Sequence, residues 1–425
     1  MSREPPPASA RRPLLRDPHA RRALVQVGGA VHETGDPAVS SRLAEALRVR
    51  AGEDDATLTH PFHAYPARLH PNTARALVRA LALPPGATLL DPFCGSGTVL
   101  VEALAQGLHA EGRDLSPLAV ALAEVKTWRT DLATRRALVR RAYIVADGAR
   151  DALRDGARFD APEGEERWFL PHTLRELAAL RAALRREHGP VGDALRMLLS
   201  SVLVKLSLQR ADSSSERVEK HVPPGAALHR FAYKSKELER CLAALEAGVP
   251  PGATRAVAED DATALETVPD RSVDGVVTSP PYANTYDYAD HHARRYVWLG
   301  LDDRAMRAGE LGAARDFRDP AEGARRFREG LAAHCEALAR VLRDGALALV
   351  VLGDGAAGRD VLRADEDLAH AAARAGLRVV AAASQPRSAY DDTSRRAFAH
   401  APRREHVIAL TRRGSAAALT DGDSP

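Results

Sequence analysis

Residues 89–103, LLDPFCGSGTVLVEA, place a carboxylate and two glycines between a short apolar run and a helical pattern. The apolar run predicts a strand that ends at Leu90, and the residues after the glycines predict a helix over about 98–106. Glycine is needed where a ligand approaches the backbone closely or where φ turns positive. The loop lacks the Gly-Lys-Ser/Thr ending of a Walker motif and differs from the dinucleotide G-x-G-x-x-G. Because Asp91 at its start would repel phosphate, a cationic or hydroxyl-rich ligand is expected here.

Helical and strand patterns alternate on both sides of this loop. A helix over about 72–83 precedes it, and a strand ending near Asp114 and a helix from about Pro117 follow it. This alternation predicts βαβ units, a parallel sheet and therefore an α/β fold. The pattern resumes with a strand in 254–265, a strand ending at Thr278, a helix near 321–343, a strand over 346–354, a helix near 360–375, and strands over 377–384 and 404–412.

Residues 128–250 lack the alternation and predict a helical insertion. Segments 173–188 and 191–210 carry apolar residues at three- and four-residue spacing, which is typical of amphipathic helices, and a further helix is expected from about Ser235. The insertion divides a core into a first part, 55–127, which would bind a cofactor, and a second, catalytic part, 251–413. Residues 1–22 contain six arginines and five prolines and predict a disordered basic arm, and residues 414–425 predict a loose tail.

Bulk composition excludes several classes of protein. The longest apolar runs fall short of the 18 residues of a membrane span, and the N-terminus lacks the apolar core of a secretion signal, so a cytoplasmic protein without a membrane partner is expected. The three cysteines are too far apart for a disulfide framework or a spaced zinc site, and no metal is expected. The net charge of +3 does not by itself announce a nucleic-acid-binding protein.

Carboxylates follow three predicted strands in succession. Asp114 lies 23 positions after Asp91, at the place where a carboxylate accepts hydrogen bonds from ribose hydroxyls. Asp260 and Asp261 end a third strand and could reach an adenine edge. The alternative is that these side chains cap helices or turns.

A second motif, VDGVVTSPPYANTYDY at residues 273–288, sets two prolines directly after a run that predicts a buried strand. Proline cannot donate to a strand ladder and fixes its own φ, so the strand must stop and display the four residues at its tip. These residues are Ser279, Pro280, Pro281 and Tyr282. The alternative is a simple strand terminator. Four further residues extend the loop and either line a pocket or cross to the next helix: Asn284, Tyr286, Asp287 and Tyr288.

DPFCGSGT together with TSPPY resembles the S-adenosylmethionine-dependent amino-methyltransferases of DNA, which methylate cytosine N4 or adenine N6. The resemblance covers 60–127 and 254–300 and implies a Rossmann-like methyltransferase fold, with a mostly parallel sheet and helices on both faces. In the family the glycine loop carries the methionine end of S-adenosylmethionine, which implies that role for Asp91, Phe93, Gly95, Gly97 and Thr98. It likewise implies a ribose contact for Asp114 and an adenine contact for Asp261. Residues 62–71, FHAYPARLHP, resemble the motif that closes over the methionine moiety through Tyr65, although His63 and Tyr65 could equally be packing residues.

The tip of the strand suits an amino group of a base. Such a nitrogen is a poor nucleophile because its lone pair is delocalised, and it needs hydrogen-bond acceptors and an in-line approach. The Ser279 hydroxyl and the Pro280 carbonyl supply acceptors, Pro281 stiffens the tip, and Tyr282 offers a face on which a flipped base can stack. In the family Ser-Pro-Pro-Tyr leans towards cytosine N4, whereas Asp- or Asn-Pro-Pro-Tyr leans towards adenine N6.

Four of the five lysines fall between Lys205 and Lys236, interleaved with hydroxyls and aromatic rings. Such a mixture suits a nucleic-acid surface, and a solvated helical face is the alternative. The residues predicted to bind nucleic acid are Lys205, Arg210, Arg217, Lys220, Lys234 and Lys236.

The sequence therefore predicts a DNA cytosine-N4 methyltransferase that acts alone or with a restriction endonuclease. RNA amino-methyltransferases and adenine-N6 enzymes are the nearest alternatives, because DPFCGSGTVLVEA resembles guanine-N2 RNA enzymes almost as closely. A non-catalytic nucleic-acid-binding protein with a decayed cofactor pocket is a third possibility, and the intact motifs speak against it.

Overall fold

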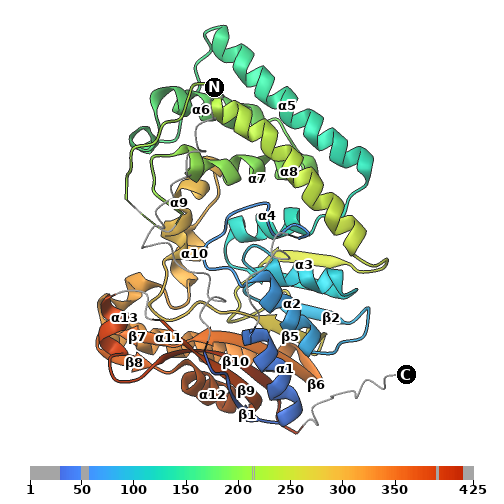
Figure 1. The fold of residues 1–425 in the computed structure, drawn as a ribbon, viewed down its shortest axis with the longest axis vertical. Helices are drawn as coiled ribbons and strands as arrows, with labels where there is room; N and C mark the ends of the chain where they lie inside the picture. The colour runs from blue at the N-terminus through green and yellow to red at the C-terminus, as the bar shows by residue number, and fades with distance from the viewer. Residues whose placement is uncertain (1–28, 49–56, 213, 215, 389–391, 415–425) are drawn as a thin grey trace, which may run out of the picture.

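The computed structural model describes residues 29–48, 57–212, 214, 216–388 and 392–414. Its eight-stranded sheet lies in the lower half of Figure 1, beneath the helices of the insertion. The predicted arm at 1–22 and nearly all of the predicted tail at 414–425 lie outside the described residues. The strands lie in the order β1 (His32–Gly35), β9 (Leu377–Arg387), β10 (Arg403–Arg412), β6 (Leu342–Gly353), β5 (Val273–Thr278), β2 (Thr88–Asp91), β3 (His109–Asp114) and β4 (Arg255–Glu259).

The sheet is parallel from β6 through β5, β2 and β3 to β4, and antiparallel at β10, β9 and β1. This confirms the predicted α/β class with a mostly parallel sheet. Parallel strands are joined by crossovers, so the carboxyl ends of β2, β3, β4 and β5 meet at one edge. Four sequence-distant strand ends are thereby brought to the same place.

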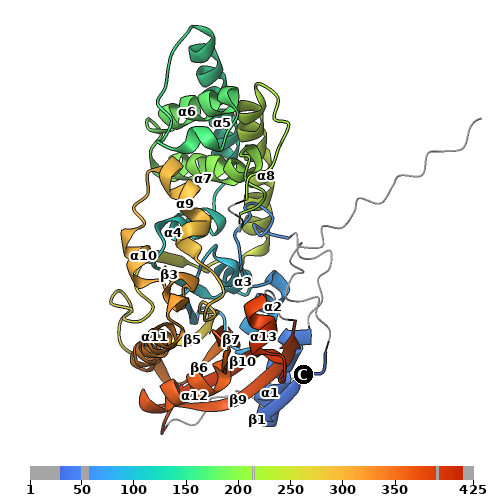
Figure 2. The ribbon, with the colours of Figure 1, turned by 90° about the vertical axis from the view of Figure 1, so that its left-hand side faces the viewer.

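Helices cover both faces of the sheet, and neighbouring residues of β2 show the division. Leu89 packs with α1 (Pro37–Arg48), α2 (Pro71–Ala80) and α3 (Thr98–Ala105), whereas Leu90 packs with α11 (Pro320–Val341) and α12 (Ala364–Arg374). Successive side chains of a strand point to opposite faces, so continuous apolar runs are what a sheet buried on both sides requires. Figure 2 shows the sheet and the helices that cover it from the side.

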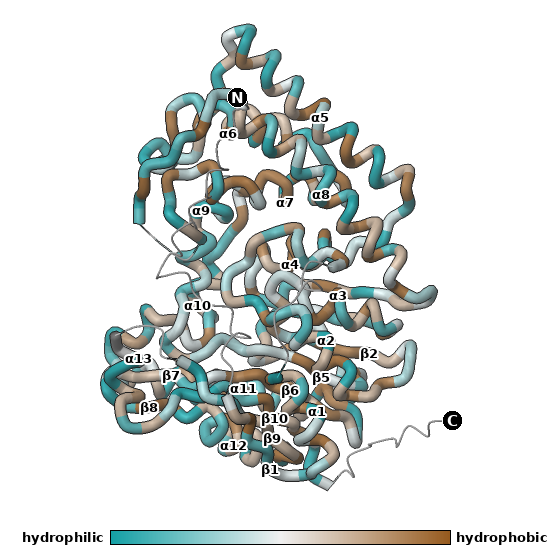
Figure 3. Tube along the Cα trace, viewed as in Figure 1, coloured by the Kyte–Doolittle hydropathy of each residue, from teal (hydrophilic) through white to brown (hydrophobic). Residues whose placement is uncertain are grey.

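The insertion consists of four long helices between β3 and β4: α5 (Leu132–Arg154), α6 (Pro171–Leu184), α7 (Gly189–Leu206) and α8 (Ala226–Gly248). They share a separate apolar core, in which α7 is largely buried and is coloured mostly as hydrophobic in Figure 3. The same core includes side chains of α4 (Pro117–Lys126) and of α9 (Tyr288–Leu299). The insertion therefore packs directly against two helices that begin beside the strand ends.

A buried carboxylate fastens the insertion to α9. Glu165 accepts hydrogen bonds from Arg294 Nη1 at 2.8 and 2.9 Å and from Trp298 Nε1 at 2.7 Å. The Arg294 guanidinium also lies 4.4 Å from the ring centroid of Trp168. A charge pair this well enclosed is strongly destabilised when one partner is removed, because the other is left buried and uncompensated.

The structure differs from the sequence prediction in several elements. Helix α8 begins at Ala226, nine positions before the predicted start, and Pro223 to Gly225 form the turn before it. Helix α5 and the pair β1–α1 were not predicted as elements. The remaining short elements are η3 (Glu165–Arg167), α10 (Arg304–Gly309), η4 (Ala314–Arg318), β7 (Gly355–Ala357), β8 (Asp360–Leu362) and α13 (Asp392–Ala397).

Among the described residues, none of the helices combines the length and the apolar character that crossing a membrane demands.

Candidate active site

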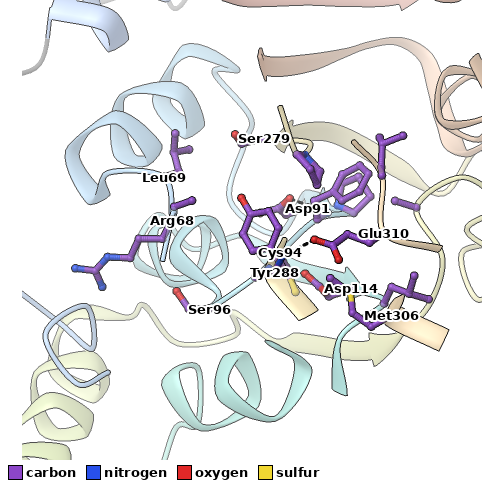
Figure 4. A pocket seen from close by; sticks show the side chains of 18 of the residues that line it. Arg68, Leu69, Asp91, Cys94, Ser96, Asp114, Ser279, Tyr288, Met306 and Glu310 are labelled. Atoms are coloured by element: carbon purple, nitrogen blue, oxygen red, sulfur yellow. Dashed lines mark hydrogen bonds between the residues drawn. The ribbon is translucent and has the colours of Figure 1, made fainter. Parts of the chain in front are cut away.

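A cavity opens at the carboxyl ends of β2, β3, β4 and β5, and it encloses about 910 Å³ of space, part of it open to solvent. Figure 4 shows Asp91, Asp114, Ser279 and Glu310 around this space. Most of the residues predicted for the cofactor and for the strand tip line it: Tyr65, Asp91, Phe93, Gly95, Thr98, Asp114, Asp261, Ser279 and Pro281. Its place at the carboxyl ends of parallel strands is where open α/β sheets bind ligands.

The glycine loop runs from β2 into α3 through two left-handed residues, Gly95 with φ of 48° and Gly97 with φ of 76°. Gly95 lines the cavity, and its amide donates to Asp114 Oδ2 at 2.8 Å. Gly97 does not line it. A Cβ at Gly97 would lie 3.1 Å from Ala123 Cα of α4, so this glycine allows helix and loop to approach closely rather than contacting a ligand.

Asp91 is almost fully buried at the end of β2 and joins it to β5. Its Oδ1 accepts hydrogen bonds from Thr278 Oγ1 at 2.8 Å and from the amide of Phe93 at 3.2 Å. Burial raises the pKa of Asp91 to about 7, against the lowering effect of these hydrogen bonds. A carboxyl with such a pKa is poised to bind a positively charged group.

Asp114 at the end of β3 is held by backbone amides on both sides. Its Oδ2 accepts from Gly95, and its Oδ1 accepts from Ser116 at 2.9 Å. Burial raises the pKa of Asp114 to about 6. Because a carboxylate has about four acceptor positions, it can still receive ligand hydroxyls from the cavity.

The two carboxylates after β4 have different roles. Asp260 does not line the cavity: its oxygens accept from the amides of Asp261 and Thr267, each at 2.8 Å, which closes a turn. Asp261 lines the cavity and uses Oδ1 for Thr263, while no residue in the described part of the chain hydrogen-bonds its Oδ2. The capping alternative thus fits Asp260, whereas Asp261 keeps an acceptor for a ligand.

The strand tip is only partly in the cavity. Ser279 and Pro281 line it, and the Pro280 ring is buried. Tyr282 does not line it: its hydroxyl donates to Glu405 Oε1 at 2.7 Å, and its ring lies against Gly353. The stacking role of Tyr282 stays a prediction, because the hydrogen bond to Glu405 on strand β10 engages the hydroxyl, and the residue is half-buried.

Of the loop after the motif, Tyr288 alone among the four residues considered lines the cavity. The Asn284 amide donates to the carbonyl of Ala356 at 2.7 Å, and Asp287 accepts from the amide of Arg315 at 3.0 Å. These two side chains hold the loop in place and fit the alternative of a crossing segment.

The segment before α2 brings Tyr65 over the glycine loop, 3.5 Å from the place of a Gly95 Cβ. Its ring stacks on His292 of α9, with centroids 4.6 Å apart. His63 is buried and its Nε2 lies 3.0 Å from Ser200 Oγ of α7, so His63 is a packing residue. Phe93, on the other side of the cavity, packs edge-on against His334 at 5.1 Å.

The part of the cavity wall formed by 306–311 was not predicted from the sequence. Met306, Gly309, Glu310 and Leu311 all line the cavity, and a Cβ at Gly309 would lie 2.7 Å from Leu115 Cδ2. Glu310 accepts from the amide of Tyr288 at 2.5 Å and from Arg315 at 2.7 Å. No motif marks this segment because its role depends on the position of α9, which only the fold defines.

One group of side chains has the composition of a metal site. Asp354, Asp365 and His406 offer ligand atoms within 4.8 Å of one another. Asp354 is already engaged by Arg363 at 2.7 Å and by the amide of Ala364 at 3.1 Å. The group thus holds the start of α12 against the sheet.

The predicted nucleic-acid cations differ in what they contact. Arg210 pairs with Glu216 at 2.8 Å, and Lys220 donates to the carbonyls of Val204 and Gln209 at 3.2 and 2.5 Å, so both serve the local fold. Arg217 is exposed beside this turn. Lys205 and Lys234 line a second hollow on the insertion, and Lys236 lies over the rings of Tyr143 and Tyr233.

A parallel α/β sheet with a glycine loop and an acidic strand end around one cavity is an arrangement that binds nucleotide-type ligands. Residues 38–154 match the UPF0020 family model, described as an RMKL-like methyltransferase domain. This match runs from α1 through the glycine loop and β3 to the end of α5.

Relatives among known proteins include type II methyltransferases and a tRNA methyltransferase. The chain is 23% identical over 266 residues to type II methyltransferase M.BsoBI of Geobacillus stearothermophilus, covering 54% of this chain and 50% of that protein. It is 43% identical over 72 residues to type II methyltransferase M.MvaI of Kocuria varians, 16% of each. It is 40% identical over 55 residues to the tRNA (guanine(10)-N2)-dimethyltransferase of Methanothermobacter thermautotrophicus, 13% of this chain and 16% of that protein. The chain thus spans half or less of these relatives.

Among solved structures, the rRNA methyltransferase aviRa of Streptomyces viridochromogenes matches 86% of this chain and 94% of its own, with 16% identity and a TM-score of 0.31.

S-adenosylmethionine is the cofactor of this class of domain, and the residues present fit it. Thr98 Oγ1 is a buried hydroxyl that lines the cavity and has no hydrogen-bond partner among the described residues. Asp261 Oδ2 also has no hydrogen-bond partner among the described residues, and Asp91 and Asp114 line the same cavity. Buried polar atoms such as Thr98 Oγ1 are rarely left unpaired, so a ligand with its own hydrogen-bonding groups fits this lining.

Proposed function

We propose that this protein transfers a methyl group from S-adenosylmethionine to an exocyclic amino group of a DNA base, with cytosine N4 as the position. The observation that carries the proposal is that Ser279 and Pro281 line the same cavity as Asp91, Asp114 and Asp261. A methyl donor held by the carboxylates would therefore lie beside the strand tip.

The chemistry asks little of the protein beyond position and hydrogen bonding. The Ser279 hydroxyl and the Pro280 carbonyl accept hydrogen bonds from the amino group, which favours the pyramidal nitrogen that attacks the methyl carbon. The carbon–sulfur bond breaks as the carbon–nitrogen bond forms, and the nitrogen releases one proton. Cys94 is buried in the glycine loop, and burial raises its thiol pKa well above the usual value, so it plays no part as a nucleophile.

DNA is favoured as the substrate by the two type II methyltransferases among the relatives and by Ser-Pro-Pro-Tyr. An RNA amino group is the second candidate, because the tRNA dimethyltransferase is 40% identical over its matched segment. Methylation of adenine N6 would need the same hydrogen-bond acceptors for the amino group. A DNA enzyme of this kind could work alone or beside a restriction endonuclease.

The test is incubation with labelled S-adenosylmethionine and either genomic DNA or total RNA, followed by nucleoside analysis. Label in N4-methylcytosine is expected. Label confined to RNA nucleosides would reject the DNA assignment, and label in N6-methyladenine would reject cytosine as the base.

Ser279→Ala tests the grip itself. Turnover should fall by about 10²- to 10³-fold, the usual loss of one transition-state hydrogen bond, while cofactor affinity stays within about twofold. Ser272→Ala is the matched control, because Ser272 precedes the other end of β5 and donates to the carbonyl of Pro269. Full turnover by Ser279→Ala would show that the hydroxyl does not hold the amino group.

A further inference from the structure

A second hollow lies on the helical insertion, away from the strand ends. It is formed by the end of α7, the turn before α8 and the first three turns of α8, and it encloses about 1180 Å³ of space that includes open solvent. Its lining contains three lysine or arginine side chains, Lys205, Arg230 and Lys234, together with His229, Tyr233 and one carboxylate, Glu237. We call the hollow with all of its lining residues the insertion groove.

The cations of the insertion groove differ in what they already contact. Glu237 pairs with Lys234 at 2.5 Å, and Lys234 is 9% exposed with its ammonium 5.5 Å from the Phe62 ring. Lys205 and Arg230 are exposed and form no ion pair within the described part of the chain. Two cations of the groove are therefore available to an anionic partner.

The helix terminus at the groove is not the anion site. Glu176 accepts from the amides of Gly225 at 2.6 Å and Ala227 at 3.0 Å, which occupies the first N–H groups of α8. Attraction for an anion must come from the side chains.

An exposed aromatic ring stands among these cations. Tyr233 is 54% exposed and stacks on His229, with centroids 6.0 Å apart and planes 14° from parallel. Lys236 lies over the Tyr233 ring at 5.8 Å. Flat exposed rings beside free cations are the combination by which proteins hold single-stranded nucleic acid, with phosphates on the cations and bases on the rings. An acidic peptide would use the cations but would not need the ring.

The insertion groove and the cofactor cavity lie on either side of one short segment. Phe62 contacts Lys234 of the groove, and Tyr65, three residues later, lines the cofactor cavity. His63 ties this segment to Ser200 of α7, beside Ser201 of the groove. This segment therefore connects the groove to the cofactor cavity.

We propose, resting on the function proposed above, that the insertion groove docks an unpaired stretch of the nucleic-acid substrate, with Lys205 and Arg230 on its phosphates and Tyr233 stacked on a base. The alternative of a brace without ligand contacts would leave these three exposed side chains without a role.

The test measures binding of a fluorescent oligonucleotide by anisotropy over a range of salt concentrations. Lys205→Gln with Arg230→Gln should weaken binding about tenfold and reduce the salt slope of log K by roughly 1.4 for a single strand, which is two phosphate contacts. Tyr233→Ala should weaken binding roughly tenfold with the slope unchanged, because stacking releases no counterions.

Matched controls lie on α5, outside the groove. Arg136→Gln with Arg140→Gln removes two exposed cations that form no ion pair with described residues, and Ile144→Ala removes a side chain that is 56% exposed. These variants should bind the oligonucleotide as the unmodified protein does. Cofactor affinity should stay unchanged in every variant.

Each outcome bears on the groove in a defined way. If the groove variants bind and methylate like the α5 controls, the groove does not dock the nucleic acid, while the proposed function stands. A protein that binds no oligonucleotide and labels no nucleic acid would overturn both. A polyglutamate peptide that competes as well as the oligonucleotide, with Tyr233→Ala silent, would identify a general polyanion surface and overturn the proposal. Equal loss for duplex and single-stranded probes would reject the unpaired strand.

Discussion

Lowering the pH should weaken S-adenosylmethionine binding, because the carboxyls of the cavity hold their protons unusually tightly. The pKa of Asp91 is raised to about 7 and that of Asp114 to about 6, in both cases by burial. A cationic donor binds the ionised forms, so affinity should be greatest above pH 8 and should fall as the pH drops through these values.

The size of the effect follows from the two pKa values. Each pH unit below a pKa costs about tenfold in the ionised fraction, or about 1.4 kcal/mol. At pH 5.5, Asp91 should therefore weaken binding by about 30-fold, and Asp114 by about a further fourfold. The free energy of unfolding should change in the same window: raised carboxyl pKa values favour the folded state fully below about pH 3.9, and that contribution is lost as the pH rises to about 7.

Titration calorimetry between pH 5.5 and 8.5 measures this directly. Asp91→Asn keeps an acceptor for Thr278 but cannot ionise, so it should bind more weakly at pH 8.5 and retain only a shallow dependence centred near pH 6. Asp270→Asn, on an exposed turn, is the control and should follow the unmodified protein. An affinity for S-adenosylmethionine that does not change over this range would refute the assignment of these carboxyls to the cofactor.

Two further substitutions separate stability from ligand contact. Gly97→Ala should lower the free energy of unfolding by about 1–2 kcal/mol, because alanine is strained at φ of 76° and would press on Ala123; in urea denaturation Gly148→Ala, in open space on α5, should be neutral or stabilising. Tyr282→Phe should lose about 1.5–3 kcal/mol by removing the hydrogen bond to Glu405, with cofactor affinity unchanged. If Tyr282→Phe instead left stability intact and abolished turnover, the tyrosine would belong to the active site after all.

The parts of the site that depend on local sequence can be predicted from the sequence alone. Asp91 and Asp114 follow consecutive strands on either side of one helix, and parallel strands bring their carboxyl ends together without any knowledge of the rest of the chain. The same reasoning placed Asp261 and Ser279, and all four line one cavity.

The parts that depend on hydrogen-bond partners far away in the sequence cannot be predicted in this way. The Tyr282 hydroxyl is hydrogen-bonded to Glu405, which lies 123 positions later, and the start of α8 is capped by Glu176, 49 positions before Gly225. Local propensity cannot foresee a cap or an acceptor supplied from another element. The wall at 306–311 was missed for the same reason.

The hydrogen bonds of Glu165 to Arg294 and Trp298 link the insertion to the cofactor cavity through α9. Helix α9 starts at Tyr288 in the cofactor cavity, and Arg294 and Trp298 further along it are held by the insertion. Replacement of the insertion by a different one during evolution would therefore remove the partners of α9. The new insertion would have to supply other partners for this helix, or the methyl-donor pocket would be disturbed. Selectivity for a target and competence for chemistry would be inherited together.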